Sequence, residues 1–208
     1  MRRLAMVLLL ALAALTARTL PAGAHAFGQN IPAGPLRGGG NLFSLDLLLG
    51  DQVDNAGVLG QARFQSGPKL DWGLQLGFSD AGSGLVLIGG DLRPLLTKNS
   101  PDLPLDVAAD VGVGLSVGDN VTEVQVVPAI EASHRFPLSG TSQALSPYGS
   151  LGLDINHVSV DNFGSDTNLD VVARFGLEWE AAPRIGIIAE FGVGNPANDF
   201  ILGANIPF

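Results

Sequence analysis

The chain has 208 residues, no cysteine, and 20 acidic against 11 basic side chains, which gives a formal net charge of −9. This balance argues against a nucleic-acid partner, because no basic stripe is present to neutralise phosphates. Without disulfides, stability must come from burial or from a closed hydrogen-bond ladder, and the length is sufficient for one domain with a sizeable core.

The first 26 residues have the pattern of a secretory signal peptide. Two arginines at positions 2 and 3 precede an apolar run over 4–15, and the small-residue sequence AHA at 24–26 is typical of a cleavage site. The apolar run is too short for a membrane-spanning helix, which needs roughly 20 residues. We therefore predict export and cleavage before Phe27, which would remove three of the 11 basic residues and none of the 20 acids.

Residues 27–41 are rich in glycine and proline, and they predict a flexible leader. From residue 42 to 208 apolar and polar residues alternate with a period of two, and no domain boundary interrupts the pattern. Over 105–117, leucine, valine and alanine alternate with aspartate, glycine, alanine and serine for 13 residues. Ordinary strands are about half as long.

About ten such runs follow one another, and turn-forming residues separate them. The runs cover 43–49, 58–64, 70–78, 86–92, 105–117, 124–136, 151–155, 169–179, 185–193 and 200–208. The sequence therefore predicts an all-β fold, an antiparallel up-and-down β-barrel of about ten strands, with eight strands as the alternative. Pro128 interrupts the sixth run, which predicts either a bulge or a smaller number of strands.

The two faces of the strands distinguish a soluble barrel from a transmembrane one. Across all the runs the apolar face has no Asp, Glu, Lys or Arg, as contact with hydrocarbon requires. The other face mixes small residues with pairable charges, which suits a narrow closed interior. A transmembrane barrel is favoured, and a secreted soluble barrel that binds an apolar ligand is the weaker alternative.

The chain ends on a phenylalanine that continues the apolar face of the last strand. Apolar residues occupy every second position of this segment, namely Phe208, Ile206, Ala204, Leu202 and Phe200. The segment resembles the C-terminal strand of bacterial outer-membrane β-barrels, which the barrel-assembly machinery recognises. The resemblance implies that residues 42–208 form a barrel in the outer membrane of a Gram-negative envelope. It implies outer-membrane lipid and the assembly machinery as partners, and it places Phe208 on the periplasmic side.

The interior face has far more acids than bases. The predicted lumen charges are Asp71, Asp106, Asp110, Glu123, Glu131, Glu178 and Glu190 with Arg63, Arg135 and Arg174, to which Asp46, Asp91, Asp154, Asp170, Glu180, Asp199 and Arg184 are added. A dry core with this surplus would be very costly, so water and small cations are expected inside, at least toward the ends. Glycines on this face are expected to leave room for them. The alternative is a plugged barrel whose charges form a polar network.

Catalytic and metal-binding motifs are scarce. After removal of the signal peptide only His134 and His157 remain, far apart and without cysteine, so no metal site and no cofactor are predicted. His157 and Ser159 share a strand face, and lipid A deacylases, which are small outer-membrane barrels, have a His-x-Ser pair near a rim. In that family the pair lies near the penultimate strand, whereas here it lies in the third strand from the end, which favours rim polarity.

Together these features predict a non-enzymatic outer-membrane barrel, with an envelope structural role or with a narrow cation-preferring pore. A lipid A-modifying enzyme that uses the His157 rim is the alternative from another functional class.

Overall fold

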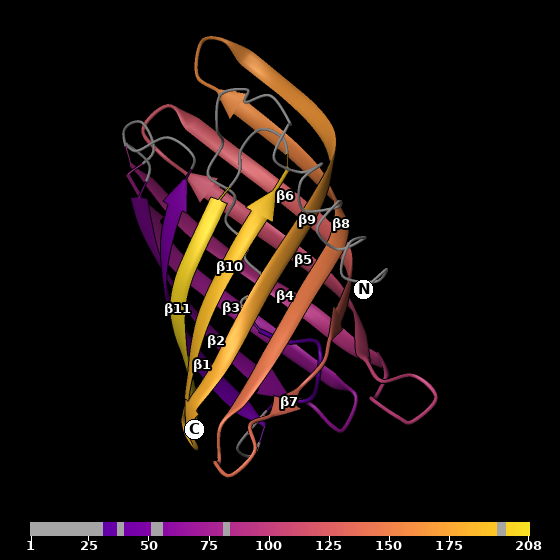
Figure 1. Ribbon diagram of the computed structural model, residues 1–208. Helices are drawn as coiled ribbons and strands as arrows, with labels where there is room; N and C mark the ends of the chain where they lie inside the picture. The colour runs from indigo at the N-terminus through magenta and orange to yellow at the C-terminus, as the bar shows by residue number, and fades with distance from the viewer. Residues whose placement is uncertain (1–30, 37–39, 51–55, 81–83, 195–198) are drawn as a thin grey trace.

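A computed structural model describes residues 31–36, 40–50, 56–80, 84–194 and 199–208, and Figure 1 shows the arrangement of the strands. The strands are β1 (Asn41–Gly50), β2 (Ala56–Gln65), β3 (Leu70–Ser79), β4 (Leu85–Thr97), β5 (Asp106–Val117), β6 (Val121–Ser133), β7 (Phe136–Pro137), β8 (Ala144–Val160), β9 (Gly164–Ala182), β10 (Ile185–Val193) and β11 (Asp199–Pro207). No helix in the described part of the chain is long and apolar enough to cross a membrane. The predicted signal peptide, residues 1–26, lies outside the described residues.

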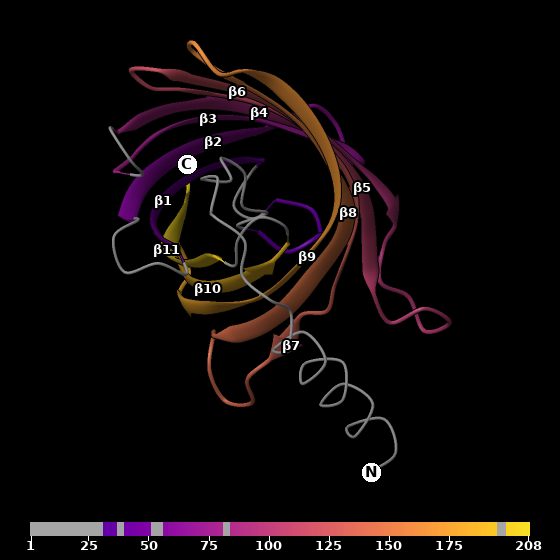
Figure 2. The same cartoon turned by 90° about the horizontal axis from the view of Figure 1, so that it is seen from above.

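Ten of these strands close into a barrel, which Figure 2 shows from above. Neighbours pair antiparallel from β1 to β6 and from β8 to β11, while β1–β11 and β6–β8 pairing closes the ring. The short β7 only pairs with the start of β8, so it is not a further strand of the barrel wall. The predicted antiparallel barrel of about ten strands is confirmed, and the eight-strand alternative is wrong, because each predicted run forms a strand of the barrel.

Pro128 lies within β6 without a bulge. β5 and β6 pair in one register along their whole length, with Pro128 opposite Val111. On its other edge, β6 leaves β8 after Val126 and rejoins it at Ala129 in the same register. The interruption is local because proline removes one amide donor while the neighbouring residues keep theirs. The prediction of a bulge or of a smaller strand count is therefore wrong.

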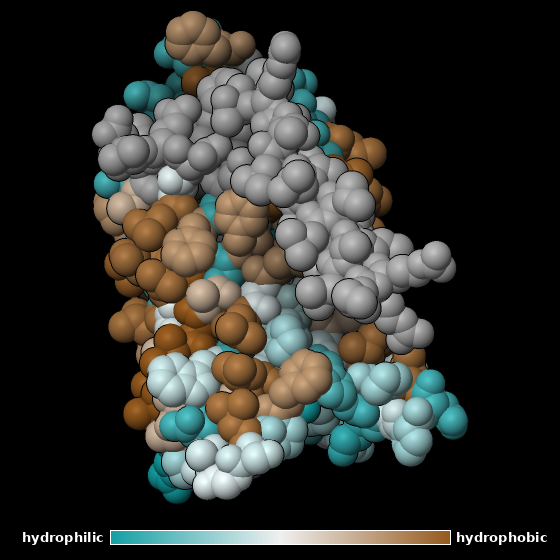
Figure 3. All heavy atoms as spheres, in the orientation of Figure 1, coloured by the Kyte–Doolittle hydropathy of each residue, from teal (hydrophilic) through white to brown (hydrophobic). Residues whose placement is uncertain are grey.

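Apolar side chains lie outside the barrel and polar side chains lie inside it. On β3, Leu74, Leu76 and Phe78 are more than half exposed, whereas Asp71 and Gln75 are buried. Figure 3 shows the outer surface: hydrophobic side chains cover the middle of the visible face, and hydrophilic ones gather toward the lower end. This is the reverse of a soluble ligand-binding barrel, so the interior is not an apolar cavity.

Aromatic side chains gather toward both ends of the apolar belt. Phe64 stacks on Trp72 with ring centroids 4.6 Å apart, and Phe208 meets Phe64 edge-on at 6.4 Å. These three rings and Trp179 lie toward the end of the barrel that contains the C-terminus, which we call the C-terminal mouth; Phe78, Phe191 and Phe200 lie toward the opposite end. Aromatic girdles at both ends are typical of barrels that cross a lipid bilayer.

The hairpin of β8 and β9 extends beyond the other strands at the opposite end (Figure 1). The two strands pair continuously from Ala144–Glu180 to Val160–Gly164. Residues 159–168, which lie between the predicted runs 151–155 and 169–179, are therefore mostly strand, and residues 161–163 form the turn. Continuous pairing with β8 explains how such a polar sequence remains extended.

Residues 31–36 lie inside the barrel. Ile31 and Ala33 are 2% and 1% exposed, and Figure 2 shows the indigo segment within the ring of strands. The predicted leader, residues 27–41, thus has residues 31–36 packed in the lumen, whereas residues 27–30 and 37–39 lie outside the described part. The glycines and prolines of this segment restrict its backbone conformations. Its packing partners come from strands distant in the sequence, so the local composition does not identify them.

Candidate functional site

The structure places the predicted lumen charges on inward positions, with the exceptions of Arg135 and Arg184. The following predicted charges are buried or half-buried on the inner face of the barrel: Arg63 (β2), Asp71 (β3), Asp106 and Asp110 (β5), Glu123 and Glu131 (β6), Arg174 and Glu178 (β9), and Glu190 (β10). Arg135 follows β6 at the C-terminal mouth, with half of its side chain exposed. Arg184 is exposed in the turn between β9 and β10, so it does not neutralise lumen acids.

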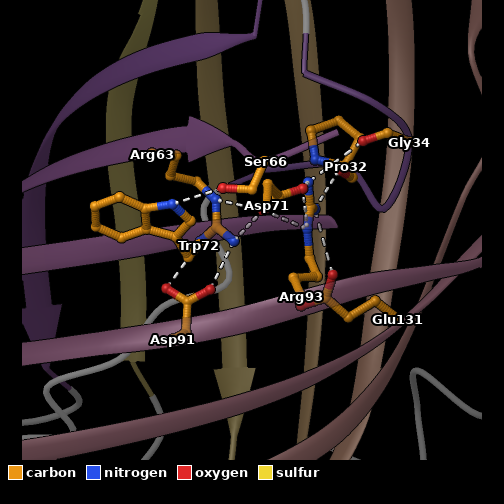
Figure 4. Close-up of polar contacts among 9 residues, drawn as sticks. All are labelled: Pro32, Gly34, Arg63, Ser66, Asp71, Trp72, Asp91, Arg93 and Glu131. Carbon is orange, nitrogen blue, oxygen red and sulfur yellow. Dashed lines mark hydrogen bonds and ion pairs between the residues drawn. The ribbon is translucent and has the colours of Figure 1, made fainter. Parts of the chain in front are cut away.

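The largest group of ion pairs lies near the C-terminal mouth and is drawn in Figure 4. Arg63 Nη2 lies 2.6 Å from Asp71 Oδ1 and 2.6 Å from Asp91 Oδ2. Arg93 Nη2 lies 2.8 Å from Asp71 Oδ2, and Arg93 Nη1 lies 3.5 Å from Glu131 Oε2. These five side chains are almost completely buried, and we call them the Arg63–Arg93 network. It joins β2, β3, β4 and β6 across the interior.

Arg93 is the functional residue that the sequence analysis missed. It follows Leu92, which is exposed on the outer face, so the alternation itself places residue 93 on the inner face. The sequence analysis missed Arg93 because the predicted run ended at Leu92, two residues before Pro94. In the structure β4 continues through Pro94 to Thr97, and Leu70 of β3 still pairs with Pro94.

A second group of ion pairs lies on β9, β10 and β11. Arg174 Nη1 lies 3.0 Å from Glu190 Oε1, and its Nη2 lies 3.0 Å from Asp199 Oδ2. The Tyr148 hydroxyl donates a 3.0 Å hydrogen bond to Glu190 Oε2. The ring of Tyr148 covers Gly176 so closely that a Cβ atom at that position would overlap it.

The lumen glycines therefore leave less room than predicted. Asp91 and Arg63 cover Gly73, as Tyr148 covers Gly176, because larger inward side chains lean over the neighbouring strand. Gly112 differs, since a Cβ atom there would have its nearest contact at 3.9 Å. The interior is filled by interdigitated side chains rather than being an open channel.

Two of the cavities that the described residues line lie at the centre of the lumen and at its mouth. The central cavity has a volume of about 40 Å³, and its lining includes Gln75, Asp110, Gly112 and Glu131. Gln75 Oε1 and Asp110 Oδ1 are buried and have no hydrogen-bond partner among the described residues. Because the volume exceeds the roughly 10–15 Å³ that one water requires, this cavity can hold water that donates to both oxygens.

The larger cavity, about 250 Å³, lies at the C-terminal mouth beside residues 31–36. Its lining includes Lys98, Asp106, Arg135 and Glu180. Arg135 donates two hydrogen bonds of 2.7 Å to the carboxylate of Glu180, and these bonds raise the pKa of Arg135. Each cavity is lined by three acidic and two basic side chains, which are Asp106, Glu178, Glu180, Lys98 and Arg135 at the mouth and Asp91, Asp110, Glu131, Arg63 and Arg174 at the centre.

The two histidines of the described ranges, His134 and His157, lie toward opposite ends of the barrel. His157 lies on the outer face of β8, where its Nδ1 lies 2.8 Å from the Thr167 hydroxyl. His134 lies in a connection at the C-terminal mouth, with Nδ1 3.1 Å from Asn99 Nδ2. Within the described ranges no group of three or more His, Asp or Glu side chains could hold a metal ion.

No family model matches the sequence, and no curated protein matches it. Among solved structures, the β domain of the Bordetella autotransporter BrkA has a TM-score of 0.52 at 13% identity, and the match covers 82% of this chain and 100% of that domain. The chain has the fold of the outer-membrane β-barrels. A KdgM porin in complex with disordered oligogalacturonate also matches, with a TM-score of 0.47, 8% identity, and coverage of 80% and 99%.

The outer membrane protein Omp33 of Acinetobacter baumannii gives a TM-score of 0.38 at 12% identity, with 81% of this chain and 98% of that chain covered. Identities this low support the fold alone. The function of this barrel must therefore be argued from its own outer surface and its own lumen.

Proposed function

We propose that the protein is a non-enzymatic outer-membrane barrel with a structural role in the bacterial envelope. The observation that carries this proposal is the reversed distribution of side chains. Leu76, Leu151 and Leu169 are more than 60% exposed, whereas Arg63, Arg93 and Glu131 are buried. An apolar belt that surrounds the molecule would drive aggregation in water, but hydrocarbon solvates it.

The closed strand ladder supports the same environment. A bilayer core offers no water to unpaired backbone groups, so strands cross it only when every edge is paired. The β1–β11 and β6–β8 seams supply that closure here. The interior supports a structural role because, among the described residues, ion pairs fill much of the lumen and larger side chains cover Gly73 and Gly176.

We expect the folded chain to remain with the outer-membrane fraction after salt and carbonate washes, and to migrate faster on gels before heating than after. Phe208 contributes the C-terminal ring against Phe64, and we propose that it also signals assembly together with Phe200, Leu202, Ala204 and Ile206. Deletion of Phe208 should therefore reduce the folded barrel in this fraction without changing export. Complete extraction of the intact chain without detergent would contradict the location, and equal assembly without Phe208 would contradict the signal.

A narrow cation-preferring pore is a second candidate, and the acid surplus of the lumen favours it. The Arg63–Arg93 network and Asp110 together contain two arginines and four carboxylates. Asp110 Oδ1 faces the central cavity without a hydrogen-bond partner among the described residues. Carboxylates that line a narrow path attract cations and exclude anions.

In planar bilayers this candidate predicts small, cation-selective current events whose selectivity weakens when Asp106 and Asp110 are replaced by Asn. Asp119→Asn is the matched control, because Asp119 is exposed in the turn between β5 and β6. Anion selectivity would contradict the pore assignment. A silent bilayer with verified folded protein would leave the structural role alone.

A further inference from the structure

Residues 31–36 are held in the lumen by a specific set of contacts. Arg93 Nη1 donates a 2.7 Å hydrogen bond to the carbonyl of Pro32, and its Nη2 donates a 3.3 Å bond to the carbonyl of Gly34 (Figure 4). The side chains of Ile31 and Ala33, which alternate with these two residues, are almost fully buried. The segment is thus recognised through its main chain and through two small apolar side chains.

The guanidinium that binds this segment is itself fixed in place. The side chain of Arg93 is 1% exposed, and it forms ion pairs with both Asp71 and Glu131. A planar guanidinium held in this way presents its remaining donors with a defined geometry. Two carbonyls spaced two residues apart fit that geometry, so the ligand of this site is a short stretch of peptide with bends at Ala33 and Gly34.

The opposite side of the segment approaches β5 closely at a glycine. A Cβ atom on Gly34 would lie 2.9 Å from Asp106 Oδ2 and 3.8 Å from Asp106 Cβ. A β-carbon at this position would require the Asp106 carboxylate to turn aside, and the β-branched side chain of valine would need still more space between the segment and β5. The close approach to β5 therefore favours a small residue at position 34.

The strand register places this site between the two cavities. Asp106, which lines the mouth cavity, pairs with Ser133, whereas Asp110, which lines the central cavity, pairs with Ala129. Glu131, the partner of Arg93, lies between these two levels on β6. Residues 31–36 therefore occupy the level that separates the C-terminal mouth from the central cavity.

The cavity of about 250 Å³ lies between residues 31–36 and part of the barrel wall, so the wall does not pack against the segment on every side. We propose that this part of the lumen is a peptide-binding site that the chain's own residues 31–36 occupy as a removable plug. Arg93 and Asp106 form the site, and the plug controls access from the C-terminal mouth to the central cavity. The inference depends on the proposed outer-membrane function in one respect only, because that function decides which compartment the C-terminal mouth faces.

The absence of cysteine from the whole chain permits a direct test by thiol labelling. In the full chain folded in detergent micelles, Ala33→Cys should react with a maleimide much more slowly than Phe163→Cys, whose position is 90% exposed. Adding Gly34→Val should displace the plug and accelerate labelling of the thiol at position 33 by about tenfold or more, because local opening then no longer has to break the contacts with Arg93. Equal labelling rates of the Ala33→Cys variant with and without Gly34→Val would overturn the plug.

A second variant tests the position of the plug without relying on its displacement. The Cβ separation of 3.8 Å between positions 34 and 106 matches that of a disulfide, so Gly34→Cys with Asp106→Cys should form one on mild oxidation. Gly34→Cys with Asp110→Cys is the control, and it should remain reduced because Asp110 lies at the level of the central cavity. Failure of the first pair to cross-link in folded protein would overturn the proposed site.

Control of access is measured at Ser150→Cys, because Ser150 lines the central cavity. Its labelling should be faster in the Gly34→Val background than with the native glycine, and an unchanged rate would overturn that role of the plug. These experiments require only a folded barrel, verified by its faster gel migration. The outer-membrane location is tested separately by fractionation, and the pore is tested separately by the bilayer recordings. A negative result in either experiment would therefore not be confused with a negative result for the plug.

Discussion

Replacing Val111 by arginine is expected to prevent the barrel from folding into a lipid bilayer, whereas replacing its neighbour Gly112 by serine is expected to be nearly neutral. Val111 lies on the outer face near the middle of β5 and is 47% exposed. An arginine at the bilayer midplane costs about 2–4 kcal/mol in a transmembrane barrel. Such a cost shifts the ratio of folded to unfolded chains by roughly 30-fold to 1,000-fold.

Gly112 is the matched control because it lies one residue further on the same strand but on the inner face. A Cβ atom there would lie 3.9 Å from Asp91 Cβ and 4.0 Å from the carbonyl of Val127, which are ordinary contacts. A serine hydroxyl can also hydrogen-bond in the polar central cavity, which Gly112 lines. Urea titrations of folding into lipid vesicles, followed by gel migration, would compare the two variants. If Gly112→Ser were the more harmful change, the assignment of the inner and outer faces would be wrong.

Replacing Arg93 by methionine should destabilise the folded barrel by about 3–5 kcal/mol, the usual cost of removing one partner from a buried ion pair. Asp71 would keep the ion pair with Arg63, but Glu131 would lose its pair with Arg93. The carbonyls of Pro32 and Gly34 would lose their donor at the same time. The same urea titrations in vesicles would measure the loss.

Two further variants test whether the loss comes from the uncompensated charge. Glu131→Gln in the Arg93→Met background should recover part of the stability, because a neutral amide is less costly to bury than a carboxylate. Lys69→Met is the control for removing a positive charge, since Lys69 is exposed in the turn before β3. An Arg93→Met variant as stable as Lys69→Met would show that the Arg63–Arg93 network contributes nothing to the folded state.

The strands and the direction of their faces follow from the sequence alone. Successive side chains of an extended chain point to opposite sides, so the alternation over 105–117 was enough to predict β5 and to separate Val111 from Gly112. The same local rule places Arg93 inside, once β4 is allowed to continue past Leu92. About ten such runs separated by turn-forming residues predicted the up-and-down barrel, and the absence of charge from one face of every run favoured a transmembrane barrel over a soluble one.

The partners inside the lumen were decided by the tertiary structure. Arg63 binds Asp91, which is 28 positions away, and Arg93 binds Glu131, which is 38 positions away. These contacts depend on the stagger of the strands and on the width of the barrel, and neither leaves a local pattern in the sequence.

The location of residues 31–36 has the same physical origin. A glycine- and proline-rich segment has similar composition whether it is free in solution or packed in a lumen. What holds this one in place is an arginine about 60 residues later in the chain, on β4, together with Asp106 on β5. The sequence determined which side chains face inward, whereas only the assembled barrel determined which of them meet and what fills the space between them.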